Sequence, residues 1–88
     1  MNRVQIGSFL ILAETKSFTK TAMALHTSQP TITRQIRNLE EELGTSLFCR
    51  NRRKMQITES GKAYYKLFNK WKGELTAIQK KYLPDTTK

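Results

Sequence analysis

The segment TSQPTITRQIRNLEEELG, residues 27–44, carries the start and stop signals of one amphipathic helix. Ser28 can cap the first turn, Pro30 stands where a missing N–H costs nothing, and Gly44 can end the helix. Four apolar residues recur between these signals at steps of four, three and four: Ile32, Ile36, Leu39 and Leu43. At about 100° per residue they fall in one narrow stripe. We therefore expect one buried face and one polar face.

The polar face of this helix offers small groups and hydrogen-bond donors near its N-terminus. It contains Pro30, Thr33, Arg34 and Arg37, with Thr31 and Gln35 beside them, whereas the last turns carry Glu40, Glu41 and Glu42. Because the positive end of a helix attracts phosphates and an acidic end repels them, the N-terminal half should face a polyanion. Such a helix can enter the major groove of DNA end-first. An ordinary solvated polar face is the alternative that this segment leaves open.

Composition points to one small, basic domain. The chain has 88 residues and a net charge of +9, which favours nucleic acid or an acidic membrane surface as partner. It shows neither a bilayer-spanning apolar segment nor a signal-peptide pattern, so we expect a cytoplasmic, nucleoid-associated protein without a membrane partner. The single cysteine, Cys49, excludes an intramolecular disulfide, and with the single histidine, His26, it cannot form a zinc-finger ligand set. We expect no metal and no cofactor.

Two helical segments precede the central one. Residues 1–15 place Ile6, Phe9, Leu10 and Ala13 on one face, which indicates a scaffold helix. Residues 16–27 predict a short helix capped by Ser17, with Phe18, Ala22 and Leu25 pointing inward. Thr19 and Lys20 at its start can reach a DNA phosphate, and a solvated lysine is the alternative. A short polar turn between this helix and residues 27–44 predicts a helix-turn-helix.

The pattern changes after Gly44 to that of a strand pair. Residues 47–50 and 55–58 flank a cationic turn, and Met55 and Ile57 alternate with polar neighbours, as in a hairpin with one face inward. The turn and its edges supply the basic residues Arg50, Arg52, Arg53 and Lys54. Crowded like charge at a hairpin tip costs stability unless an anion meets it. We expect this tip to lie along or enter the minor groove of DNA, with a solvated basic loop as the alternative.

A long helix is expected from residue 59 to about 82, capped by Thr58 and stopped by Pro84. Its apolar residues step by four and three in a heptad seam: Tyr64, Phe68, Trp71, Leu75, Ile78 and Tyr82. The helix should extend roughly 36 Å, too far for a small core to cover its distal half. We expect the same helix of a second subunit to cover this seam in a homodimer. Folding back on its own domain is the alternative.

A series of spaced residues agrees in order with a known pattern over residues 3–82. They are Ser17-Phe18-Thr19, Ala22, Leu25, Ser28-Gln29-Pro30, Arg34-Gln35-Ile36, Leu39-Glu40, Leu43-Gly44, Leu47-Phe48, Arg50, Thr58 and Gly61. The chain thereby resembles the N-terminal DNA-binding domain of LysR-type transcriptional regulators. It departs from that family at four positions: Lys16 for the usual Gly, Thr21 for Ala, Thr33 for Ser and Ile57 for Leu. None of these removes a functional group, although Lys16 should alter the turn before the second helix.

The resemblance implies a mainly α, winged helix-turn-helix fold: a three-helix core, a β-hairpin wing and a long dimerisation helix. It implies a dimer that inserts two recognition helices into successive major grooves of double-stranded DNA. Base contacts fall to Gln29, Pro30, Thr33 and Arg34; wing contacts to Arg50 and Arg53, with Arg52 and Lys54 beside them; and backbone contacts to Ser17, Thr19 and Lys20, to which we add Thr31 and Arg37. Gln29 can read an adenine edge, Pro30 can touch a thymine methyl, and Arg34 can donate to guanine or phosphate.

The expected organisation is a DNA-binding domain at residues 1–58, a linker and dimerisation helix at 59–82, and a tail at 83–88. Family members carry a C-terminal effector-binding domain, which would bring a small-molecule effector and a tetramer in a full-length chain. This chain ends just beyond Pro84, so we expect an excised domain rather than a natural short form.

Two other classes of function are alternatives to a transcription factor. A protein-interaction or oligomerisation module with non-specific polyanion binding would use the long helix as its main contact surface. An enzyme is disfavoured because the sequence offers no paired carboxylates in a plausible cleft, no Ser/His/Asp arrangement and no phosphate-cradling glycine loop.

Overall fold

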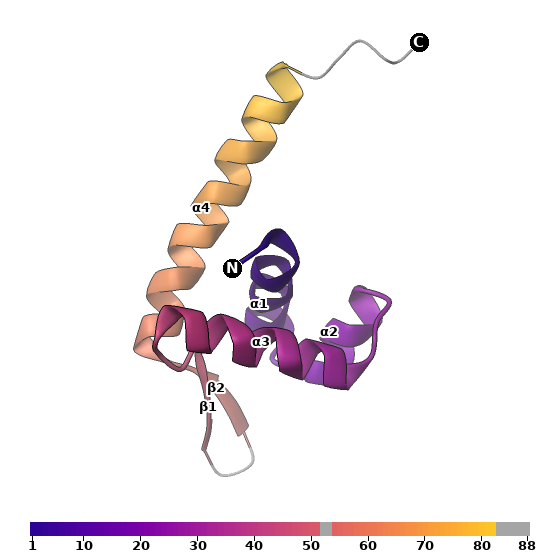
Figure 1. Cartoon of the computed structure of the whole chain (residues 1–88), viewed down its shortest axis with the longest axis vertical. Coiled ribbons are helices and arrows are strands. Elements are labelled where there is room, and N and C mark those ends of the chain that lie inside the picture. Colours follow the sequence, from indigo (N-terminus) through magenta and orange to yellow (C-terminus); the bar gives the residue numbers. More distant parts are fainter. Residues whose placement is uncertain (52–53, 83–88) are drawn as a thin grey trace.

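The computed structural model describes residues 1–51 and 54–82. Its elements in chain order are α1 (Arg3–Thr15), α2 (Phe18–Ala24), α3 (Gln29–Leu43), β1 (Phe48–Asn51), β2 (Lys54–Ile57) and α4 (Glu59–Lys81). The first three helices form a cluster, a hairpin projects from one side of it, and α4 extends away (Figure 1). The expected mainly helical winged helix-turn-helix fold with a long last helix is confirmed.

Side-chain caps set the helix starts. The hydroxyl groups of Ser17, Ser28 and Thr58 accept hydrogen bonds from backbone N–H groups in the first turns of α2, α3 and α4, as expected from the sequence. Gly44 ends α3 with a φ of 75°, which glycine adopts without steric cost. The second helix is shorter than expected and ends at Ala24, because His26 takes a left-handed conformation with a φ of 55°.

The hydrophobic core centres on Phe9 of α1. Its ring centroid lies 5.5 Å from that of Phe48 in β1 and 5.9 Å from that of Phe68 in α4, so one side chain joins three elements. The other fully or nearly buried apolar residues are Leu10, Leu12, Ala22, Ile32, Ile36, Leu39 and Leu47. Leu12 lies outside the single face predicted for the first helix. It is buried because α1 contacts α2, α3 and α4 and so has more than one covered side.

The hairpin is tighter than expected. The antiparallel register pairs Phe48 with Ile57 and continues to Asn51 opposite Lys54, so the ladder includes the two outer residues of the expected four-residue turn. Met55 and Ile57 are half-buried while Lys54 and Gln56 are exposed, so the strand alternates as predicted as far as Ile57. Thr58, expected on the polar face, is half-buried because it caps α4. Arg52 and Arg53 lie outside the described residues.

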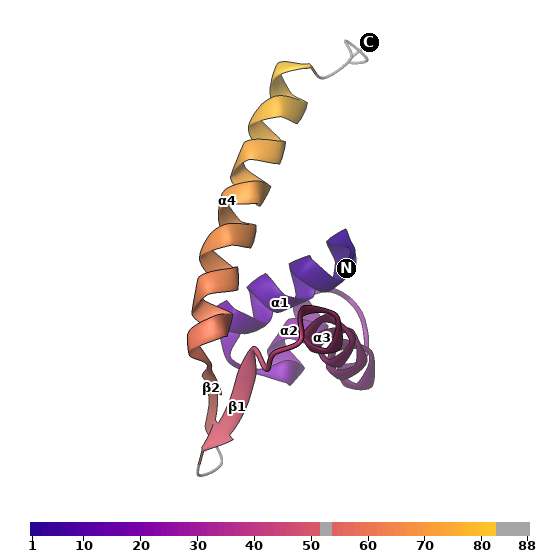
Figure 2. The same cartoon turned by 60° about the vertical axis from the view of Figure 1, so that its left-hand side comes forward.

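The root of the hairpin, Ser46–Phe48, is fastened to the start of α4. Thr58 donates its backbone N–H to the Leu47 carbonyl oxygen at 2.9 Å, and the hydroxyls of Thr58 and Ser60 donate to the Ser46 carbonyl oxygen at 2.6 and 3.0 Å. Figures 1 and 2 show the hairpin and α4 running in opposite directions from this junction. The junction therefore fixes the two projecting elements relative to each other.

The two halves of α4 have different surroundings. Phe68 is 1% exposed in the domain's own core and Tyr64 is half-buried, so the assignment of Phe68 to a dimer seam is corrected by this packing. The core thus continues past residue 58, the expected end of the DNA-binding domain. Beyond it the seam is open: Trp71 is 46%, Leu75 42%, Ile78 57% and Tyr82 70% exposed. The expected tail, residues 83–88, lies outside the described part of the chain.

Candidate nucleic-acid interface

The exposed face of α3 gathers all four residues expected to read bases. Gln29, Pro30, Thr33 and Arg34 are exposed and, together with Arg37, line one shallow hollow. The amphipathic spacing produces this arrangement because Ile32, Ile36 and Leu39 hold the opposite face in the core. We call the five hollow-lining residues the reading face.

Hydrogen bonds restrict two side chains of the reading face. Gln29 donates through Nε2 to Thr19 Oγ1 at 3.4 Å, which links the start of α3 to the start of α2. Thr33 donates its hydroxyl to the Gln29 carbonyl oxygen at 3.2 Å, so its outward-facing oxygen remains available as an acceptor. Gln29 retains its second amide hydrogen and its carbonyl oxygen for a ligand.

The residues expected to touch the DNA backbone divide into two groups. Thr19, Lys20 and Arg37 are exposed. Ser17 and Thr31 are half-buried, and both take part in capping: Ser17 Oγ accepts from the Lys20 N–H at 3.0 Å, and Thr31 Oγ1 shares a hydrogen bond with Ser28 Oγ at 2.8 Å. These two hydroxyls therefore have a structural function in the helix starts.

Gln35, expected beside the polar face, turns toward the interior instead. It is half-buried and accepts a hydrogen bond from the hydroxyl of Ser8, which is fully buried in α1. Periodicity placed Gln35 at the margin of the face and did not show that a buried donor lay across from it.

The hairpin stands beside the reading face. Arg50 and Lys54 are exposed. A groove between α3 and the hairpin is lined by Thr33, Ile36, Arg37 and Glu40 of α3 and by Phe48, Cys49, Arg50 and Met55 of the hairpin. Phe18 of α2 also lines it. Arg37 and Arg50 thus share one groove, so cations from two elements converge there. Cys49 is exposed on the hairpin and forms no disulfide.

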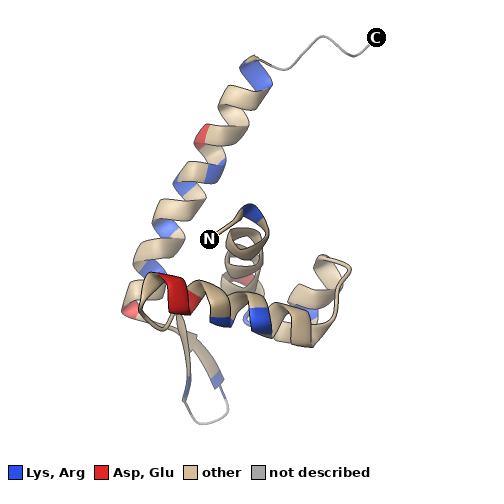
Figure 3. Ribbon diagram, viewed as in Figure 1, with Lys and Arg blue, Asp and Glu red and all other residues tan. Residues whose placement is uncertain are grey.

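Charge is distributed along α3 as expected from the sequence. Figure 3 shows basic residues on the middle of α3 and on the hairpin, and acidic residues at the end of α3 near α4. One acid has a contact that sequence reasoning missed: Glu40 accepts hydrogen bonds from the backbone N–H groups of Leu47 and Phe48. The sequence gives no signal for this contact, because only the tertiary packing shows that Glu40 is half-buried and faces the start of a strand.

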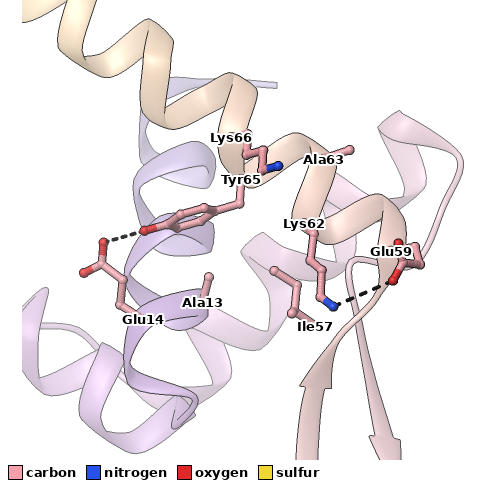
Figure 4. Close-up of a pocket in the computed structure, with 8 residues that line it drawn as sticks. All are labelled: Ala13, Glu14, Ile57, Glu59, Lys62, Ala63, Tyr65 and Lys66. Atoms are coloured by element: carbon pink, nitrogen blue, oxygen red, sulfur yellow. Dashed lines mark hydrogen bonds and ion pairs between the residues drawn. The ribbon is translucent and has the colours of Figure 1, made fainter.

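A separate pocket lies between α1, the end of β2 and α4, and no residue of the reading face lines it (Figure 4). Tyr65 donates its hydroxyl to Glu14 at 3.1 Å, and Lys62 lies 3.7 Å from Glu59. The hydrogen bond to Glu14, with desolvation and the carboxylate charge, raises the pKa of the Tyr65 phenol above its ordinary value. The Tyr65–Glu14 hydrogen bond joins α4 to α1, whereas the Lys62–Glu59 pair lies within α4.

A helix-turn-helix with an exposed cationic helix face and a basic hairpin beside it defines the class of winged helix-turn-helix DNA-binding domains. Comparison with known proteins agrees with this class. The sequence model of the family described as "bacterial regulatory helix-turn-helix protein, lysR family" matches residues 4–62. The chain therefore belongs to the LysR family and is its helix-turn-helix DNA-binding domain. The family consists of transcriptional regulators and not of enzymes.

Individual relatives show the same likeness. The HTH-type transcriptional activator IlvY of Haemophilus influenzae is 48% identical over 64 residues, which make up 73% of this chain and 22% of that protein. A crystal structure of the BenM DNA-binding domain with catB site 1 DNA is 36% identical, with a TM-score of 0.83 over 89% of this chain and 88% of that one. The CbnR DNA-binding domain in its DNA complex is 31% identical, with a TM-score of 0.83 over the whole of both chains.

The chain spans about a fifth of the length of IlvY. Within residues 1–51 and 54–82, none of the helices is long and apolar enough to cross a membrane.

Proposed function

We propose that this chain binds a roughly two-fold-symmetric DNA operator as a homodimer, and thereby controls transcription in the bacterial cytoplasm. The observation that carries the proposal is the reading face: four side chains suited to base edges lie exposed together at the N-terminal half of α3. The BenM and CbnR domains that the fold resembles are described in complexes with DNA.

The chemistry of the reading face matches the donors and acceptors of base edges. The Gln29 amide can donate to adenine N7 and accept from adenine N6, and Arg34 can donate two hydrogen bonds to guanine. The Pro30 ring offers an apolar surface for a thymine methyl group. Lys20, Arg37 and the hairpin cations Arg50 and Lys54 are exposed where they can neutralise phosphates.

Dimerisation is supported by the open part of α4. Leu67, Trp71, Leu75 and Ile78 are large apolar side chains that the described residues leave substantially exposed on one projecting helix. Large apolar side chains gathered on one exposed helix are typical of an interaction site. A second copy of α4 would cover it with identical residues about a two-fold axis, which would also set the spacing of the two reading faces.

Loss of an arginine from the reading face tests the proposal. A preferred duplex is first selected from random sequences, and binding of the parent chain and of Arg34→Ala is then measured by fluorescence anisotropy. We expect the variant to lose about 1–3 kcal/mol on that duplex and less on unrelated DNA. Arg3→Ala is the charge-matched control, because Arg3 lies at the first residue of α1 outside the reading face.

Equal binding of Arg34→Ala and Arg3→Ala to the selected duplex would contradict the proposed docking. Binding that is strong but indifferent to sequence would instead favour the second candidate, an oligomerisation module with non-specific polyanion binding. The exposed apolar part of α4 is the feature that supports this second candidate.

A further inference from the structure

Glu40 joins α3 to the root of the hairpin through two hydrogen bonds. Its Oε2 atom accepts hydrogen bonds from the backbone N–H groups of Leu47 at 2.7 Å and Phe48 at 3.2 Å. The side chain is half-buried and lines the groove that Arg37 and Arg50 also line. One carboxylate oxygen thus joins the end of the recognition helix to the first residues of the wing.

We propose that Glu40 is a positioning residue for DNA binding, which holds the hairpin at a fixed angle to α3 so that its cations reach the same duplex. This inference rests on the proposed function, because it assumes that the hairpin meets DNA. Two backbone N–H groups point at one acceptor, and a charged acceptor binds such groups more strongly than a neutral one. Without the Glu40 carboxylate, these two N–H groups would be left without an acceptor in a partly buried position, which costs free energy.

The opposite side of the root is anchored independently. Ser46 and Leu47 accept hydrogen bonds from Thr58 and Ser60 at the start of α4. Those bonds connect the hairpin to α4 and leave its orientation toward α3 to Glu40 and to apolar packing. Loss of Glu40 should therefore loosen the angle between wing and recognition helix without detaching the wing.

The sign of the effect separates positioning from simple electrostatics. An acid near DNA repels phosphate, so its removal should tighten binding if charge alone matters. A positioning acid has the opposite effect, because its removal weakens binding. Glu41 is the matched control: it is the next residue, it is exposed, and its substitution changes the net charge by the same amount.

The experiment compares Glu40→Ala and Glu40→Gln with Glu41→Ala and Glu41→Gln on the selected duplex at constant salt. We expect the Glu41 variants to bind as tightly as the parent or more tightly, and Glu40→Ala to bind about tenfold more weakly, the size of one lost DNA contact. Glu40→Gln keeps an oxygen acceptor and should fall between Glu40→Ala and the parent. Glu40→Gln is the milder change, so it can replace Glu40→Ala in the test if the alanine variant fails to fold.

Two further measurements link the loss to the hairpin. Amide hydrogen exchange at Leu47 and Phe48 should become faster in Glu40→Ala and stay unchanged in Glu41→Ala. In a chain with alanine at all four basic positions of the hairpin, Arg50, Arg52, Arg53 and Lys54, Glu40→Ala should cause little further loss of affinity.

The inference is overturned if the Glu40 variants bind as tightly as the Glu41 variants, or if the loss persists in full without the hairpin cations. Failure of the proposed function has a different signature. In that case the parent chain binds no duplex selectively, while exchange at Leu47 and Phe48 still responds to Glu40.

Discussion

Single residues explain how this chain accommodates its departures from the family pattern. Thr21, where the family usually has alanine, is fully buried, and its hydroxyl shares a hydrogen bond of 2.8 Å with Thr15 Oγ1. The extra polar atom therefore has a partner, as a buried hydroxyl requires. Lys16, where the family usually has glycine, adopts a φ of 56° and donates its backbone N–H to Leu12 as α1 ends. The turn keeps the left-handed conformation that glycine would take more easily.

Gly61 carries the sharpest prediction at this scale. A Cβ atom there would overlap the carbonyl oxygen of Leu47 and lie 2.6 Å from Ile57 Cγ1, so α4 can approach the hairpin root only with glycine. We expect Gly61→Ala to lower the free energy of unfolding by about 1–3 kcal/mol in urea denaturation at fixed protein concentration.

Gly7→Ala is the control for this prediction. A Cβ at Gly7 meets nothing within 4 Å, so alanine should stabilise α1 by about 0.5–1 kcal/mol. Equal effects of the two substitutions would show that the close approach at Gly61 does not limit packing.

At the scale of elements, the single heptad seam of α4 has two parts: the first packs on the domain's own core, and the second is exposed. Tyr64 and Phe68 pack on the core. The ring centroid of Phe68 lies 5.6 Å from that of Trp71, the first residue of the exposed part. The seam pattern predicted the apolar line correctly and could not show where the domain's own core stops covering it. That limit depends on how far α1 extends along α4.

Substitution in the exposed part tests the homodimer. Trp71→Glu together with Leu75→Glu should shift the chain from dimer to monomer in sedimentation velocity, because two carboxylates would have to be buried in the interface. The far-ultraviolet circular dichroism should stay close to that of the parent, since the core lies outside this part.

Asn69→Glu with Thr76→Glu is the matched control, because these exposed residues lie on the other side of α4 and add the same charge. A parent chain that sediments as a monomer would refute the proposed dimer.

At the scale of the whole molecule, three elements must act on one duplex. The described part measures 52 × 26 × 20 Å, with α4 extending away from the helical cluster and the hairpin pointing in the opposite direction (Figure 2). The start of α4 therefore connects the proposed dimer contact to the proposed DNA contact. The Glu14–Tyr65 hydrogen bond and the caps around Thr58 stiffen that connection.

The salt dependence of DNA binding measures how many cations of the two subunits contact phosphates. Each phosphate neutralised contributes a slope of about −0.9 to the plot of log K against log salt concentration. Arg50→Ala with Lys54→Ala should therefore reduce the slope by roughly 3 to 4 for a dimer with both hairpins engaged.

Lys80→Ala with Lys81→Ala, at the far end of α4, should leave the slope unchanged. A reduction of only roughly 2 after loss of Arg50 and Lys54 would indicate that half of these cations in the dimer meet phosphates.

The sequence by itself determined the elements and the chemistry of the reading face. Caps, glycine stops and apolar spacing are local signals, so the bounds of α3 and α4 and the exposure of Gln29 and Arg34 could be predicted from residues close in the chain. Only the tertiary structure decided that Phe68 belongs to the core, that Gln35 turns inward to Ser8, and that Glu40 holds the hairpin root. Each of these depends on a partner at least seven residues away along the chain, and the distance to such a partner is set by packing rather than by local periodicity.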